Sequence, residues 1–158
     1  MTRDRLNKRE IRLLQERTGL PYVEARRLLI AFRDVLDREP HLSTNGFGLA
    51  PRMTGKETLA ERQEQFRDHR DQLERAADRV IEVHQWLREN IRPIKTPGQG
   101  SYGMKHVVEN ALGQYVSNGE LIAAALMAGY PMGKVHGPNT DFGMSKRDVD
   151  RARASVRA

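Results

Sequence analysis

The chain has 158 residues, of which 38% are hydrophobic and 30% are charged, and its mean hydropathy is −0.70. The clustered, periodic apolar residues argue against a disordered chain and predict one compact domain, while the absence of cysteine excludes disulfides and thiolate metal sites. No apolar run approaches the roughly 18 residues of a membrane span and the first residues lack an apolar leader, so we expect a cytoplasmic protein without a membrane partner.

The positive charge lies toward the two ends of the chain. The net charge is +6 and the pI is about 10.0. Residues 1–40 and 92–158 carry +3 and +4, whereas residues 55–91 carry −2. This polarity favours either contact with a polyanion or packing of the basic ends on the acidic middle of the same chain or of a second copy.

Two helices are predicted in residues 1–40. Asn7 can cap the first helix, Gly19 can end it, and Pro21 suits the first position of the second. The hairpin also fits a DNA-binding helix-turn-helix, with nucleic-acid contacts at Tyr22, Arg26, Arg27 and Arg33. Gln15 stands where a small residue usually lets the helices approach, so a purely structural hairpin is the alternative.

A linker loop and one long helix are predicted next. Residues 41–54 have the Ser, Thr, Asn, Gly and Pro content of a loop. Residues 55–91 are predicted to be a single helix opened by a capping box of Thr54 and Glu57. Its apolar seam repeats every seven residues at Leu59, Phe66, Leu73, Val80 and Leu87.

The seam predicts burial within the chain or a coiled-coil homodimer. The second position of the repeat is polar at Gln63, Arg70 and His84. We therefore expect the first half of the helix to be less buried than the second, and a break near residues 68–69 is an open alternative.

Residues 92–158 are predicted to form a C-terminal helical unit. Ser117 and Glu120 have the spacing of a capping box, and residues 121–128 are apolar on every face of the helix that follows. A helix of this kind belongs at the centre of a packed unit, and we expect it there.

The end of the chain is predicted to be a loop and a basic helix. Residues 131–144 favour an ordered loop over a hairpin that turns at residues 137–139. Ser145 can cap a last helix, whose basic side chains are further candidates for nucleic-acid contact: Lys146, Arg147, Arg151 and Arg153. An ordinary solvated amphipathic helix is the alternative.

Residues 98–103 match the G-x-G-x-x-G pattern of dinucleotide-binding loops, and a helix is predicted over residues 104–112. That pattern works after a strand of a parallel sheet, and the proline-rich lead-in predicts no such strand. We therefore expect a flexible connector. Phosphate binding by backbone N–H groups of this loop, with Lys95 and Lys105 nearby, is the open alternative.

The other reactive residue types predict neither metal binding nor catalysis. No two of the five histidines have the i, i+4 spacing of a metalloprotease helix, and no activated-nucleophile motif is present. Tyr102, Tyr115, Tyr130 and Phe142 are assigned to the core by default, although aromatic rings near Lys105 are also able to stack bases.

The sequence as a whole predicts an all-α fold with a helical hairpin, a long central helix and a C-terminal helical unit. The leading functional hypothesis is a small, basic, non-enzymatic nucleic-acid-binding protein without a cofactor, DNA-associated and regulatory, with duplex DNA as its partner. The alternative is a helical protein-protein interaction or assembly factor that uses the seam or the C-terminal unit. An enzyme or nucleotide binder at the glycine loop ranks third.

Overall fold

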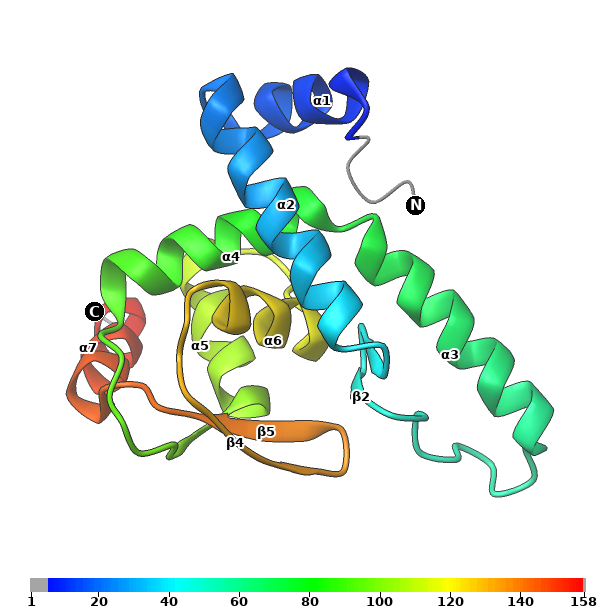
Figure 1. Ribbon diagram of the computed structural model, residues 1–158. Coiled ribbons are helices and arrows are strands. Elements are labelled where there is room, and N and C mark those ends of the chain that lie inside the picture. Colours follow the sequence, from blue (N-terminus) through cyan, green and yellow to red (C-terminus); the bar gives the residue numbers. More distant parts are fainter. Residues whose placement is uncertain (1–5, 158) are drawn as a thin grey trace.

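The computed structural model describes residues 6–157, so residues 1–5 of the predicted hairpin segment lie outside the described part. The helices are α1 (Lys8–Thr18), α2 (Tyr22–Arg38), α3 (Leu59–Glu74), α4 (Ala77–Asn90), α5 (Ser101–Leu112), α6 (Asn118–Met127) and α7 (Lys146–Arg157) (Figure 1). The strands are β1 (Leu42–Ser43), β2 (Gly46–Phe47), β3 (Gln99–Gly100), β4 (Met132–His136) and β5 (Asn139–Phe142). The prediction of an all-α fold is wrong, because two small antiparallel sheets accompany the helices.

Helix α6 lies at the centre of the molecule, in contact with α2, α4 and α5 (Figure 1). The capping box predicted for it is present, since Ser117 Oγ accepts from Glu120 N and Glu120 Oε1 accepts from Ser117 N. Residues 121–125 are fully buried, as predicted, whereas residues 126–128 are only half-buried. An apolar helix at this place forms most of its contacts inside the protein, its capped first turn included, and only its last turn approaches the surface.

The α1–α2 hairpin is present as predicted. Asn7 Oδ1 caps α1 by accepting from Arg9 N at 3.0 Å, and Gly19 ends the helix in the left-handed region with φ of 72°. Gln15, the residue that fits a helix-turn-helix poorly, donates from Nε2 to Leu20 O at 3.2 Å and so holds the turn. The buried face of α2 packs on α1, α4 and α6.

The predicted single helix over residues 55–91 is two helices. The break falls between α3 and α4, where Ala76 has φ of −96° and ψ of 25°, and not near residues 68–69. Helix α3 begins at the capping box of Thr58 and Glu61. Glu57 instead accepts from the backbone N–H of Thr54 at 2.9 Å in a turn. Hydrogen bonds from the backbone, this one foremost, lower the pKa of Glu57 to about 2.

The segment predicted as a linker, residues 41–54, contains a buried hairpin. β1 and β2 pair in antiparallel register, and all four of their residues are buried. Strands this short are held by tertiary contacts rather than by their own sequence pattern. Arg70 of α3 secures the segment, since its guanidinium donates to the carbonyl oxygens of Leu36, Glu39 and Leu42 at 2.7 to 2.9 Å.

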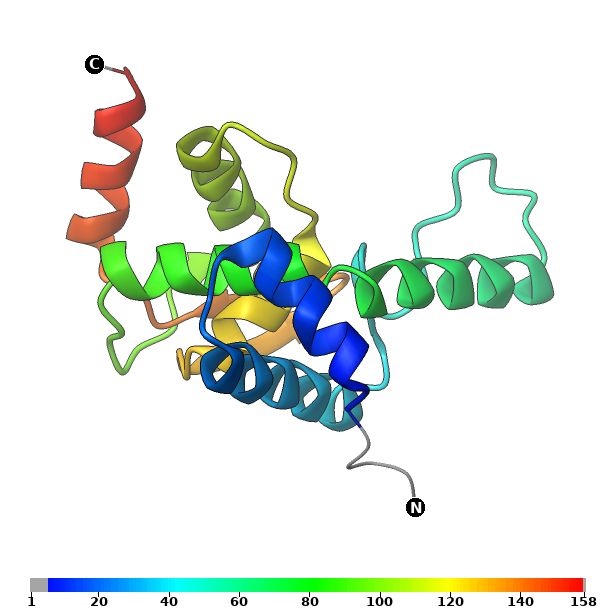
Figure 2. The same cartoon turned by 90° about the horizontal axis from the view of Figure 1, so that it is seen from above.

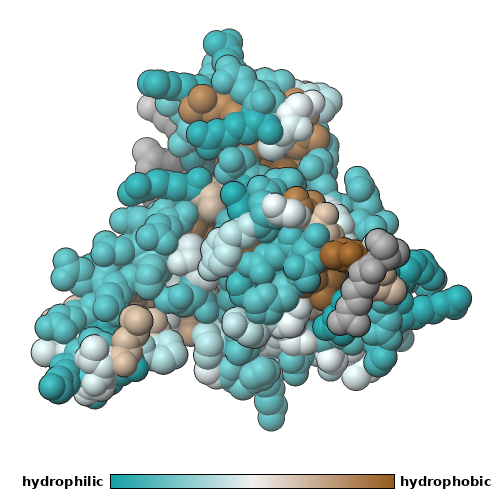
Figure 3. All heavy atoms as spheres, turned by 180° about the vertical axis from the view of Figure 1, so that it is seen from behind, coloured by the Kyte–Doolittle hydropathy of each residue, from teal (hydrophilic) through white to brown (hydrophobic). Residues whose placement is uncertain are grey.

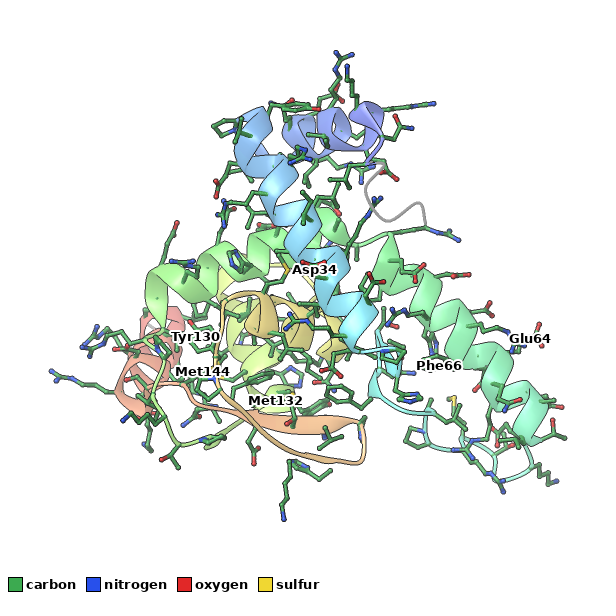
Figure 4. All side chains as sticks on the ribbon, in the orientation of Figure 1. Asp34, Glu64, Phe66, Tyr130, Met132 and Met144 are labelled. Atoms are coloured by element: carbon green, nitrogen blue, oxygen red, sulfur yellow. The ribbon has the colours of Figure 1, made fainter. Side chains whose placement is uncertain are left out.

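A three-stranded sheet with the order β3-β5-β4 covers one side of α5. The loop predicted for residues 131–144 is therefore wrong, because this segment forms the β4–β5 hairpin. Phe142 and Thr140 of β5 are fully buried, and Ser101 Oγ accepts from Thr140 N at 3.2 Å. Tyr130, which precedes β4, donates to Leu87 O at 2.8 Å, and burial raises its pKa to about 12 (Figure 4).

Helix α7 begins after Ser145, whose Oγ accepts from Asp148 N at 3.3 Å, and it packs on α5 with Val149 buried. The backbone N–H of Arg92 donates to Asp148 at 2.9 Å and lowers the pKa of this carboxyl group. Within residues 6–157, no helix combines the length and the apolar character needed to cross a membrane. The face in Figure 3 is mostly hydrophilic, with apolar side chains in small separate groups.

Candidate nucleic-acid interface

The four candidate residues of α2 lie on its exposed or half-buried side: Tyr22, Arg26, Arg27 and Arg33. Arg27 donates to Glu24 from Nε at 3.2 Å, and this hydrogen bond lowers the pKa of Glu24. Arg33 donates to Glu10 of α1 at 2.7 Å. Two of the three arginines are thus paired with acids of the hairpin itself, which weakens their attraction for a phosphate.

The candidate residues of α7 are all at the surface: Lys146, Arg147, Arg151 and Arg153. Asp150 lies 2.6 Å from the ammonium of Lys146 and 4.0 Å from the guanidinium of Arg153. Arg151 lies 3.8 Å from Asp148. Since α7 packs on α5 while α2 packs on α1, α4 and α6, the two groups of basic residues form separate surfaces (Figures 1 and 2).

The glycine loop is part of the three-stranded sheet. Gly98 N donates to Phe142 O at 3.0 Å, and β3 pairs with β5 in antiparallel register. A two-residue antiparallel strand does not supply the parallel βαβ unit of a dinucleotide site. None of the three glycines of the motif has a positive φ. The prediction of a flexible connector is therefore also wrong. Lys95 is exposed and precedes this ordered loop.

Lys105 points into the protein. Its ammonium group donates to Glu109 Oε1 at 3.1 Å and to Val116 O at 3.2 Å, and the side chain is 9% exposed. The same nitrogen lies 5.6 Å from the ring centre of Tyr102 and 4.7 Å from that of Tyr115. These distances are in the range of cation–π interactions, so the lysine connects the two rings.

Glu109 balances the charge of Lys105. Burial alone would raise the pKa of Glu109, but hydrogen bonds from Val116 N, Lys105 and His106 together lower it. The carboxylate is therefore ionised at neutral pH and neutralises the buried ammonium group. His106 also packs edge-on against Tyr102, with ring centres 4.8 Å apart.

Tyr102 and Tyr115 are 57% and 68% exposed, so their default assignment to the core is wrong, whereas Tyr130 and Phe142 are in the core as predicted. The two exposed rings lie at a cavity of about 400 Å³. We call this cavity the tyrosine pocket, and the residues that matter for its chemistry are Asn45, Tyr102, Lys105, Tyr115, Asn118 and Asn139.

Asn118, the first residue of α6, connects three segments of the pocket wall. Its Nδ2 donates to Asn45 O at 3.1 Å, Pro138 O at 3.2 Å and Asn139 Oδ1 at 2.9 Å. Asn45 Nδ2 in turn lies 2.8 Å from His69 Nδ1. Asn118 is only 6% exposed, and its Oδ1 accepts no hydrogen bond within the described part of the chain.

Two glycines let these segments come together. A Cβ atom on Gly46 would collide with Pro138 O and Asn118 Nδ2, and one on Gly119 would collide with Ser43 O. Backbone contacts of this kind leave little room for adjustment. The β1–β2 hairpin, the start of α6 and the β4–β5 turn therefore form one rigid wall.

The surface is also hollowed on a neighbouring face of α5, toward α7. Gly103, His106 and Arg153 line a second cavity of about 260 Å³ between α5 and α7. His106 of this second cavity packs against Tyr102 of the tyrosine pocket. An extended ligand that lies along α5 would therefore reach from the basic side chains of α7 to the tyrosine pocket.

Sequence reasoning missed the three asparagines, because they lie far apart in the chain. Asn45 precedes Gly46 in a signature of tight hairpins, and Asn118 directly follows the cap residue Ser117, but neither signal predicts that they meet. No protein family, curated protein or solved structure matches this sequence.

Proposed function

We propose that this protein binds single-stranded nucleic acid, without catalysis, by stacking bases on Tyr102 and Tyr115. The observation that carries the proposal is the exposure of these two rings, 57% and 68%, both within cation–π distance of Lys105 at one cavity. Aromatic faces stack any base, and each such contact contributes about 1–3 kcal/mol.

Basic residues near the pocket supply the attraction for phosphates. Residues 92–158 carry a net charge of +4, and α7 presents Arg153 at the surface beside α5. A strand along α5 would place phosphates near α7 and bases near the tyrosines. Contacts with phosphates position a strand without reading its sequence.

The pocket favours a single strand over a duplex, because bases inside a duplex are already stacked on each other and do not reach a tyrosine. Duplex DNA binding by α1–α2 stays a prediction. Acids pair with basic residues on both surfaces, as Glu24 does with Arg27 on α2 and Asp150 with Lys146 on α7, so the exposed tyrosines and not the charges favour the pocket. A cytoplasmic location also remains part of the proposal.

Protein-protein assembly is the second candidate function. It is favoured by the apolar side chains left on α3 and the loop before it, where Leu59 is 57% and Met53 is 93% exposed. The part of the seam on α4 is covered by α2 and α6 of the same chain, so it is not free for a coiled coil.

Binding of a fluorescein-labelled oligonucleotide, followed by fluorescence anisotropy, tests the stacking proposal. We expect Tyr102→Leu and Tyr115→Leu each to weaken binding by roughly 5- to 140-fold, which corresponds to about 1–3 kcal/mol. Tyr102→Phe and Tyr115→Phe keep the ring and should bind within about twofold of wild type. Arg67→Ala, on the exposed arm α3, controls for surface substitution.

The proposal fails if both leucine variants are folded, by thermal melting, and bind as tightly as the phenylalanine variants. It also fails if wild-type protein binds no oligonucleotide at low salt, where the phosphate contribution is largest.

A further inference from the structure

The Lys105–Glu109 pair of α5 holds both backbone groups of Val116. Glu109 Oε1 accepts from Val116 N at 3.1 Å, and Lys105 Nζ donates to Val116 O at 3.2 Å. The two side chains are joined to each other at 3.1 Å, and only 9% and 17% of their area is exposed. Because residues four positions apart lie on one face of a helix, the pair fixes one residue of the loop that leaves α5.

Val116 directly follows Tyr115, so the pair also determines where the Tyr115 ring lies. Val116 is fully buried, and the centre of the Tyr115 ring is 4.7 Å from Lys105 Nζ. The same nitrogen lies 5.6 Å from the ring centre of Tyr102, three residues earlier on α5. Lys105 therefore relates the position of a ring on a loop to the position of a ring on a helix.

Contacts with α4 hold the same loop from its other side. Arg79 donates to Tyr115 O, and Gln114 Nε2 donates to Glu82 Oε2 at 2.7 Å. These bonds fix the loop against α4. The pair on α5 adds the restraint toward the helix that carries the other ring.

We infer that Lys105 and Glu109 are positioning residues, which set Tyr115 beside Tyr102 before a strand binds. A loose loop would have to be ordered during binding, and a ring that is already in place avoids this cost. The inference rests on the proposed function and assigns the two side chains a part in it. It also changes the role of Lys105, which the sequence predicts as a contact for nucleic acid, because its charge is balanced by Glu109 and its side chain is nine-tenths buried.

The two roles of Lys105 predict opposite results for Glu109→Ala. If Lys105 contacts a phosphate, removal of the neighbouring acid should leave the affinity for a labelled single-stranded oligonucleotide unchanged or raise it. If the pair positions Tyr115, the loss of the acceptor for Val116 N should lower the affinity, and we expect a fall of about two- to tenfold, the range of one hydrogen bond. Fluorescence anisotropy at fixed salt measures the change.

Three comparisons separate positioning from a loss of charge or of structure. Glu64→Ala removes one exposed acid from α3, far from the pocket, and should bind within about twofold of wild type. Glu109→Gln keeps an oxygen that accepts from Val116 N and should recover most of the affinity that Glu109→Ala loses. In a Tyr115→Leu background, Glu109→Ala should have little further effect, because the ring that it positions is absent.

The salt dependence of binding tests the same assignment from the side of the lysine. Loss of one phosphate contact would flatten the slope of log affinity against log salt by about 0.7 for a single strand. We expect Lys105→Met to bind more weakly with the slope unchanged. Arg153→Ala, at the surface beside α5, is the comparison and should flatten the slope. An equally flattened slope in Lys105→Met would overturn the inference.

The outcomes separate the two proposals. Unchanged or higher affinity in Glu109→Ala, with binding still weakened by Tyr115→Leu, overturns positioning and keeps stacking. No binding by wild-type protein overturns both. If thermal melting shows that Glu109→Ala is unfolded, the test moves to Lys105→Met combined with Glu109→Leu, which removes both charges and leaves neither one buried alone. Wild-type affinity in this folded double variant would overturn the inference, and a fall of about two- to tenfold would support it.

Discussion

Helices α3 and α4 follow each other in the chain and carry the same seven-residue apolar repeat, but only α4 belongs to the core. Val80 and Leu87 of α4 are fully buried, whereas Leu59 of α3 is 57% exposed and Leu73 is the only buried residue of that helix. Figure 2 shows α3 projecting from the rest of the molecule, with the loop of residues 48–58 beside it.

The difference comes from the elements that pack on each helix. α4 contacts α2 and α6, whereas α3 contacts mainly β1. In Figure 4, Phe66 lies on the side of α3 toward β1 and β2, and Glu64 lies on the outer side. A heptad repeat thus indicates a helix and the face that is available for packing, but burial depends on what the rest of the chain places opposite. The tyrosine pocket depends on α4, the buried half of the apolar repeat, because Asn118 is the first residue of α6, and α6 packs on α4.

The largest expected effect is that of Val80→Asp. An unpaired carboxylate at this fully buried position costs several kcal/mol, a large part of the stability of a typical domain of about 5–15 kcal/mol. We expect loss of the cooperative thermal transition by circular dichroism. A variant that melts like wild type would contradict the assignment of α4 to the core.

Ile122→Ala should destabilise the protein by about 2–5 kcal/mol, because it leaves a cavity at the fully buried centre of α6. Urea unfolding measures the change. Ile94→Ala, at a position 43% exposed, is the matched control and should change the free energy of unfolding by less than about 1 kcal/mol. Equal effects of the two substitutions would place α6 outside the core.

A smaller effect is expected from pH through His84 of α4. Burial lowers the pKa of His84, Arg88 and Arg27 lower it further, and Glu24 opposes them. The unfolded chain therefore binds the proton more readily than the folded one, so stability should fall as the pH drops below the unfolded pKa of about 6.5. Urea unfolding between about pH 7.5 and pH 5 measures this loss.

His84→Leu isolates the contribution of this histidine to the pH dependence. His84 is 5% exposed and its Nδ1 has no partner in the described part of the chain, so leucine suits the site. The variant should lose less stability than wild type on acidification. An unchanged pH dependence would show that other groups cause it.

The smallest effect is expected from Leu59→Asp, at the exposed end of the arm. Surface substitutions of this kind usually change stability by no more than about 0.5 kcal/mol. Urea unfolding should give nearly the wild-type free energy, and sedimentation should give the wild-type mass. A large loss of stability or a change in mass would mean that α3 is covered by a second copy, and would favour the assembly hypothesis.

Helix boundaries that depend on local chemistry were predictable from the sequence. The cap of Ser117 with Glu120 and the end at Gly19 are examples, since the groups that bond lie within a few residues of each other. The short strands were not predictable, because pairs such as Gln99 with Phe142 depend on distant segments. The tyrosine pocket was hidden for the same reason. Its asparagines come from three segments far apart in the chain: the β1–β2 turn, the start of α6 and the start of β5. Tyr102 and Tyr115 are of a residue type that is common in cores, so the sequence alone did not mark them as exposed.

The central claim is that bases, and not only phosphates, contact the tyrosine pocket. Its most direct test is the affinity of wild-type protein for one single-stranded oligonucleotide and for the same sequence as a duplex, at one salt concentration. We expect tighter binding of the single strand, with Tyr102→Leu and Tyr115→Leu reducing only that preference, because the phosphate attraction is common to both forms. Equal or tighter binding of the duplex, unaffected by these substitutions, would contradict the claim and return the interface to α1–α2.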